Sequence, residues 1–188
     1  MKGVIVAVVI IALLFAIGVG WYIGGLNKVV TLHEAVSGEW SQVETQLQRR
    51  NDLIPNLVST VKGYAAHEKE IFSEVARLRS QWAESSGREQ QIETANKTSS
   101  AISRLLLVAE NYPNLKASEN FLALQSQLEG TENRIAVARR RYNLKVRGFN
   151  TYIRTVFGGF FAGKRGLMEP EIYFEADEAS KENPKVSF

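Results

Sequence analysis

The chain has 188 residues, of which 45% are hydrophobic and 23% are charged, and its formal net charge is +3 at pH 7. So small a positive charge does not by itself favour nucleic acid, and we expect no nucleic-acid partner. The sequence contains no cysteine, which excludes a thiol nucleophile and does not distinguish the two sides of a membrane.

The first predicted element is an uncharged apolar run over residues 4–23. A helix of about twenty apolar residues crosses a hydrocarbon core of about 30 Å. The alternative is a cleaved secretory signal, but Trp21 and Tyr22 are unfavourable beside a cleavage site and suit the headgroup interface. We therefore expect residues 1–27 to be a transmembrane anchor. Lys2 and the amino terminus against Lys28 favour a cytoplasmic N-terminus and an extracytoplasmic domain, by a difference of one charge.

Small residues recur at every fourth position of this run and form one ridge of the helix. They are Ala12, Ala16, Gly20 and Gly24. Small residues let two membrane helices approach closely, so the ridge predicts self-association and a homo-oligomer. The alternative is that alanine and glycine are simply common in such helices.

Apolar side chains then recur every three or four positions in four segments between residues 28 and 157, the last running to Val156. Residues 85–87 and 112–114 are predicted turns. The first break lies either at Pro55 or near Gly63. Only the second choice gives helix lengths that nearly cancel, at about 55, 28, 36 and 64 Å. We therefore predict a kink at Pro55 inside a long first helix, and an all-α fold with an antiparallel up-down-up-down four-helix bundle over residues 28–157.

Polar residues interrupt this pattern in two places. The candidates are Arg49, Arg50, Asp52, Pro55, Glu132, Asn133 and Arg134. One interpretation is a buried polar network or a docking surface for a partner. The other is that these residues satisfy the backbone at the kink and fix the register of the helices.

Residues 158–188 are predicted to be an interfacial segment and a flexible tail. Cations and aromatic residues mix before and within its start, at Arg147, Arg154, Phe157, Phe160, Phe161, Lys164 and Arg165. This composition is typical of a segment in contact with a membrane surface, although a solvated helix face is the alternative. The apolar C-terminus is either captured by a partner or frayed.

No pattern for catalysis, a metal or a cofactor is visible. The two histidines, His33 and His67, lack the Glu-x-x-His spacing of di-metal bundles. The sequence also lacks G-x-S-x-G, G-x-G-x-x-G and P-loop motifs. We therefore expect no enzyme activity, no cofactor and no small-molecule substrate.

Several motifs resemble the signature of the LemA family. They are WSQV at 40–43, RRNDLIPNLV at 49–58, VKGY at 61–64, ENYP at 110–113, TENRI at 131–135 and YFE at 173–175. The resemblance implies a bacterial protein, anchored in the cell (inner) membrane by one N-terminal helix and built on a four-helix bundle. It carries over no catalytic residues. A related branch takes part in forming the magnetosome membrane. Residues 156–160 and Ser187 depart from the usual pattern.

Two functions remain open from the sequence. The first is a non-enzymatic, membrane-anchored scaffold that contacts lipid, self-associates and organises membrane or envelope proteins. The alternative is an adaptor that binds a client or a membrane peptidase through the bundle surface or the C-terminal tail.

Overall fold

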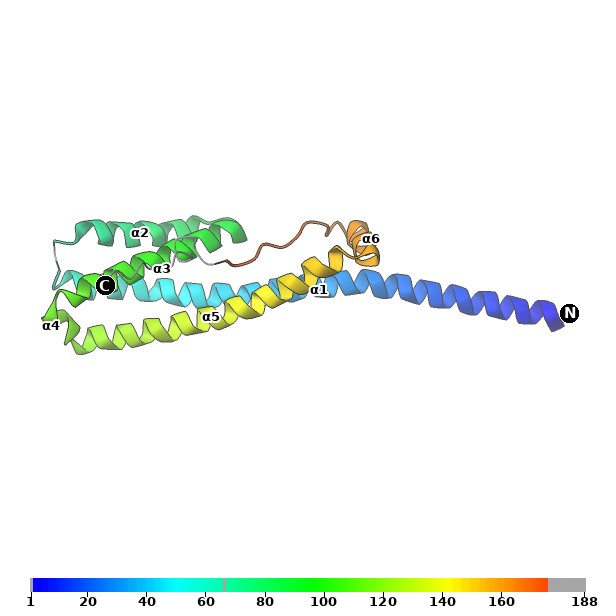
Figure 1. The fold of residues 1–188 in the computed structure, drawn as a ribbon, viewed down its shortest axis with the longest axis horizontal. Coiled ribbons are helices and arrows are strands. Elements are labelled where there is room, and N and C mark those ends of the chain that lie inside the picture. The colour runs from blue at the N-terminus through cyan, green and yellow to red at the C-terminus, as the bar shows by residue number, and fades with distance from the viewer. Residues whose placement is uncertain (1, 66, 176–188) are drawn as a thin grey trace, which may run out of the picture. The chain divides into compact units, whose positions relative to one another are not determined.

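A computed structural model describes residues 2–65 and 67–175, and within these ranges the protein contains helices and no strands (Figure 1). The predicted all-α class is confirmed. The six helices in the described residues are α1 (Lys2–Lys62), α2 (Lys69–Glu84), α3 (Arg88–Glu110), α4 (Pro113–Lys116), α5 (Glu119–Ile153) and α6 (Val156–Arg165).

The first helix, α1, is 61 residues long and continues through Pro55 to Lys62. The prediction that the first break lies near Gly63 rather than at Pro55 is confirmed. Within the described residues, α1 is the one helix with a stretch long and apolar enough to cross a membrane, and none of that stretch is buried. The apolar side chains of α1 before residue 24 are therefore exposed among the residues that the structure describes.

The described residues form two compact units. Unit 1 comprises the residues up to 39 together with 143–171, and unit 2 comprises 40–142 together with the residues from 172 onward. Helices α1 and α5 contribute residues to both units, because the boundaries at 39/40 and 142/143 fall inside them.

The core of unit 2 draws side chains from α1, α2, α3, α4 and α5. Fully buried examples are Leu57, Leu78, Leu105 and Leu115, and Leu128 is almost so. Burying a leucine side chain contributes about 1.5–3 kcal/mol relative to leaving it exposed. In Figure 1, α2 and α3 run in opposite directions on either side of the turn at residues 85–87. Gly87 in that turn has φ +104°, a conformation that favours glycine.

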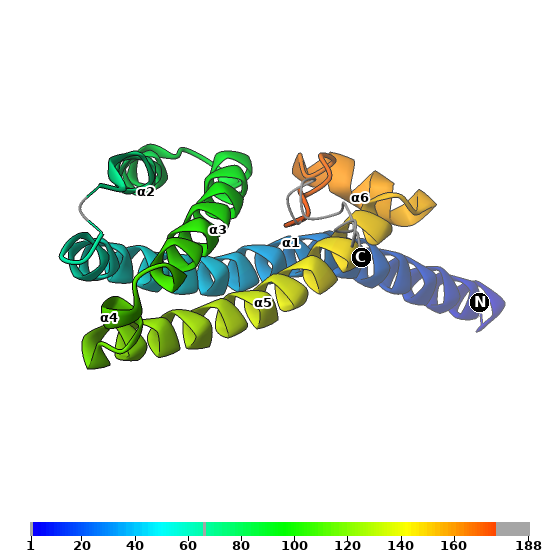
Figure 2. The same cartoon turned by 60° about the vertical axis from the view of Figure 1, so that its left-hand side comes forward.

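Two predicted details differ from the structure. The predicted break at 112–114 does lie between α3 and α5, but it is not a plain turn, because Pro113 begins the short helix α4 and Leu115 enters the core. The last long helix does not reach Val156 but ends at Ile153, and α6 follows as a separate helix (Figure 2). The Thr155 side chain caps α6 by accepting a hydrogen bond from the Gly158 amide at 3.1 Å.

The predicted division at residue 157 thus falls inside α6. Of the interfacial segment and tail predicted at 158–188, residues 158–165 belong to α6, and 166–175 follow it without regular secondary structure. The tail from 176 to 188, including Ser187, lies outside the described residues.

Candidate functional site

An aromatic cluster joins α6 to α1 within unit 1. The Trp21 ring lies 5.3 Å from the Phe157 ring and 5.1 Å from the Phe161 ring, between centroids. The Tyr22 ring lies 6.5 Å from Phe160 and 6.0 Å from Phe161. All four pairs have the edge-to-face geometry that aromatic quadrupoles favour. The cluster lies at the end of the apolar stretch, where a spanning helix meets the headgroups.

Close contact between the two helices depends on a glycine of α1. A Cβ atom placed on Gly25 would lie 2.1 Å from the Phe161 ring, closer than any real contact. Phe161 is therefore almost fully buried, at 2% exposure. The ring packs against α1, and Phe161 is the buried member of the predicted membrane-surface set, whose other six residues are exposed.

The other predicted membrane-surface residues remain accessible. Phe157 and Phe160 are 63% and 49% exposed, and Lys164 lies 5.8 Å from the centre of the Phe160 ring. The remaining cations, Arg147, Arg154 and Arg165, are exposed as well. Helix α6 therefore presents aromatic and cationic side chains together.

The side chain of Asn150, in α5, binds the main chain of the segment that follows α6. Asn150 is buried, and its side chain forms two hydrogen bonds with Glu171. The Asn150 Nδ2 donates to the Glu171 carbonyl at 2.9 Å, and the Glu171 amide donates to Asn150 Oδ1 at 2.8 Å. The Glu171 carboxylate also lies 3.2 Å from His33 Nε2, and the His33 ring contacts that of Phe149.

In unit 2, residues 172–175 pack against α3, α5 and α1, whose Trp40 ring lies 6.3 Å from the Phe174 ring between centroids. The Tyr142 hydroxyl donates to the Ile172 carbonyl at 2.7 Å, and Asn96 of α3 donates to the Glu175 carbonyl at 3.0 Å. Phe174 is buried, with the Arg139 guanidinium 4.2 Å from its ring centre. Burial lowers the pKa of Arg139, against the attraction of nearby Glu132, and the charge of Arg50 lowers it further.

A buried arginine connects α1 with α3 and α5 in the same unit. Arg50 is 1% exposed and donates to the Ser99 hydroxyl at 2.7 Å, the Ala95 carbonyl at 3.0 Å and the Glu132 carboxylate at 3.1 Å. Burial lowers the pKa of the Arg50 guanidinium, and Glu132 opposes this shift by its charge and its hydrogen bond. Arg50 therefore makes contacts across helices, instead of satisfying the backbone near Pro55.

The remaining predicted polar residues do not join this network. Arg49, Asp52, Pro55, Asn133 and Arg134 are all exposed. Of the seven predicted residues, the structure joins Arg50 and Glu132, and it adds Ser99 and the Ala95 carbonyl, which no sequence pattern indicated. In the ridge of α1, a Cβ on Gly20 or Gly24 would meet nothing within 4 Å.

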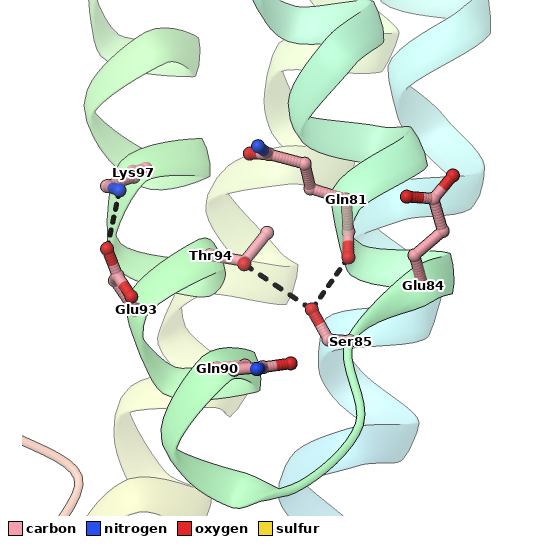
Figure 3. A pocket seen from close by; sticks show the side chains of 7 residues that line it. All are labelled: Gln81, Glu84, Ser85, Gln90, Glu93, Thr94 and Lys97. Carbon is pink, nitrogen blue, oxygen red and sulfur yellow. Dashed lines mark hydrogen bonds and ion pairs between the residues drawn. The ribbon is translucent and has the colours of Figure 1, made fainter.

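A polar pocket of about 360 Å³ lies at the turn between α2 and α3 (Figure 3). The Ser85 hydroxyl lies between the Gln81 carbonyl, at 2.6 Å, and the Thr94 hydroxyl, at 3.5 Å. Glu93 and Lys97 pair on the α3 side. In residues 2–65 and 67–175, no three His, Asp or Glu side chains are grouped to hold a metal ion.

These features define a class: an all-α protein with a candidate membrane-spanning helix, an aromatic cluster at the end of its apolar stretch, and a helical unit with a buried arginine. The family model described as the LemA family matches residues 39–188, and the chain belongs to that family. The resemblance seen in the motifs is confirmed.

Three curated relatives extend this finding. Protein LemA of Metamycoplasma hominis is 25% identical over 161 residues, covering 85% of this chain and 73% of the relative. Magnetosome protein MamQ of Magnetospirillum gryphiswaldense and MamQ 2 of Paramagnetospirillum magneticum are each 26% identical over 175 residues, covering 79% of this chain. The chain spans 64% of the length of each MamQ protein. None of these names denotes an enzyme.

Proposed function

We propose that this protein is a non-enzymatic scaffold, anchored by α1 in the bacterial cell membrane, that self-associates and organises membrane or envelope proteins. The single-pass anchor carries the helical unit, arranged as an antiparallel four-helix bundle, on the extracytoplasmic side. The observation that carries the proposal is the exposed apolar stretch of α1, which ends at the aromatic cluster of Trp21, Tyr22 and α6.

Helix α6 supports a second attachment to the membrane. Its exposed Phe157 and Phe160 would enter the headgroup region, and Lys164 and Arg165 would contact anionic headgroups. Each cation close to an anionic leaflet contributes about 1 kcal/mol. An exposed apolar surface beside a spanning helix is suited to lipid, and a tryptophan such as Trp21 at the end of the apolar stretch is typical of the headgroup interface.

The small-residue ridge supports self-association. Ala12, Ala16, Gly20 and Gly24 are exposed, and the two glycines have open space around their Cα atoms. A neighbouring helix of a second copy would approach closely along this ridge.

The experiment is to measure the mass of the full-length protein in mild detergent by light scattering, and in lipid nanodiscs by native mass spectrometry. We expect an oligomer for the wild type and for Gly18→Leu, which lies off the ridge, and a shift to monomer for Gly24→Leu. Both glycines have open space around them, so neither leucine disturbs the chain itself. A monomeric wild type in lipid, or equal effects of the two leucines, would contradict the proposal.

A further inference from the structure

One face of α1 in unit 2 forms the floor of a polar groove beside the end of α2 and the start of α3. The groove consists of two adjoining hollows of about 600 and 430 Å³, both lined by Gln48, Trp82 and Gln91. The α1 side runs from Ser41 to Asp52, which is about 16 Å at 1.5 Å per residue. That length matches about five residues of an extended chain.

Asn51 lines the smaller hollow and has no hydrogen-bond partner among the described residues. Its side chain is 2% exposed, yet neither the amide nitrogen nor the carbonyl oxygen is paired. Buried carboxamides are almost always paired, because an unpaired buried polar group destabilises the folded state. A buried donor and acceptor beside a groove therefore indicate a place for a ligand.

The neighbouring polar groups are already engaged with one another. The Trp82 indole N–H donates to Gln48 at 3.4 Å, and Gln48 in turn donates to Asp52 at 2.8 Å. Gln91 donates to Glu44 at 3.0 Å. These contacts hold the walls of the groove in place, and among its described lining residues Asn51 has the buried carboxamide without a hydrogen bond.

Charge does not select the ligand. The two carboxylates of the groove, Glu44 and Asp52, are matched by the guanidinium groups of Arg49 and Arg79. With formal charges that cancel, the groove attracts neither an anion nor a cation strongly. It is suited to a neutral ligand that offers both donors and acceptors.

A peptide unit offers such a pair, one N–H and one C=O, and a carboxamide can bond to both. This chain already uses that chemistry: Asn150 binds both main-chain groups of Glu171, and Asn96 donates to the Glu175 carbonyl. We propose that Asn51 binds the main chain of an extended segment of a partner protein, about five residues long and without net charge, with Trp82 against its side chains. This interaction goes beyond the scaffold function and does not require self-association.

The test uses the full-length protein in nanodiscs. A phage library of random dodecapeptides is selected on the wild type and counter-selected on Asn51→Leu. The selected peptides, made synthetically, are then titrated while the indole N–H resonance of Trp82 is followed by NMR. We expect a shift of that resonance and at least a tenfold loss of affinity in Asn51→Leu. Asn56→Leu, an exposed asparagine of the same helix, should change affinity less than twofold.

Thermal unfolding separates a ligand site from a structural amide. Replacing an unpaired buried carboxamide by leucine should raise the unfolding midpoint by about 2–4 °C, whereas an amide bridged by buried water would make the same change destabilising. If Asn51→Leu does not fold, Asn51→Ser, which is too short to reach both groups of a peptide unit, replaces it in the affinity measurement, where the same tenfold loss is expected.

Three results would overturn the proposal. The first is a library that yields no peptide dependent on Asn51. The second is a folded Asn51→Leu protein that unfolds at a lower temperature than the wild type. The third is a Trp82 resonance that shifts with a tetramer of N-acetylglucosamine and not with peptides, which would make the groove a glycan site.

Discussion

The contact between Arg50 and Glu132 gives the sharpest prediction for stability. Glu132→Gln leaves a guanidinium that is 1% exposed without its counter-ion. Breaking a fully buried pair typically destabilises by about 3–5 kcal/mol. The effect should be smaller here, because the Glu132 side chain is 39% exposed and therefore screened. Arg50 also keeps its bonds to Ser99 and Ala95.

We therefore expect Glu132→Gln to lower the free energy of unfolding by about 2 kcal/mol, or the midpoint by about 4–8 °C in a chain of this size. Helical circular dichroism of the full-length protein in detergent measures the change. Adding Arg50→Met removes the buried charge and leaves Ser99 bonded to the Ala95 carbonyl at 3.2 Å. The double variant should come within about 1 kcal/mol of the wild type.

The matched control is Glu129→Gln, an exposed glutamate three residues earlier on α5 that accepts a local hydrogen bond from Gln125 of the same helix. It should change stability by less than about 0.5 kcal/mol. Equal midpoints for Glu132→Gln and Glu129→Gln would refute the reasoning, and so would a double variant that is less stable than Glu132→Gln alone.

Two further predictions concern unit 1. A Cβ on Gly158 would lie 1.9 Å from the Tyr152 carbonyl oxygen, so Gly158→Ala should displace the start of α6. The loss of the Thr155 cap should destabilise the helix by about 1 kcal/mol. Hydrogen exchange should therefore become faster throughout α6. Asn150→Leu removes both bonds to the Glu171 main chain. It should therefore destabilise residues 167–175 locally by about 1–3 kcal/mol, seen as faster limited proteolysis there. Unchanged exchange in α6, or unchanged proteolysis, would contradict the respective prediction.

Each of these variants has a matched control. Gly163→Ala meets only the flexible Met168 side chain, with its sulfur at 3.3 Å, and should leave the exchange of α6 nearly unchanged. Asn133→Leu replaces an exposed asparagine of the same helix as Asn150, and should not change proteolysis of residues 167–175.

Helix class and the first long helix were predictable because they depend on local chemistry. A period of three to four residues is a property of each segment by itself. The end of α1 at Lys62 followed from comparing helix lengths. The break between α5 and α6 was missed because Val156 continues the apolar spacing of α5. Thr155, directly before a new apolar run, is an N-cap signal that identifies this break.

The polar contacts were less predictable, because they depend on how helices distant in sequence align. Arg50 and Glu132 are 82 residues apart, and no local pattern pairs them. Arg49 and Arg50 are neighbours of the same type, yet one is exposed and the other is buried. Helical phase separates them: Arg50 lies three residues after Leu47 and four before Ile54, on the buried stripe.

The ring of Phe161 seated on Gly25 has a consequence for the membrane helix above it. A single helix in a bilayer can rotate about its long axis. The packing of the Phe161 ring at Gly25 instead fixes the rotation of α1 relative to α6. If α6 lies on the lipid surface and the protein self-associates, as proposed above, every copy would turn the same stripe of α1 toward its neighbours. A substitution in α6 would then reorient the meeting faces of two copies without altering a single residue inside the bilayer.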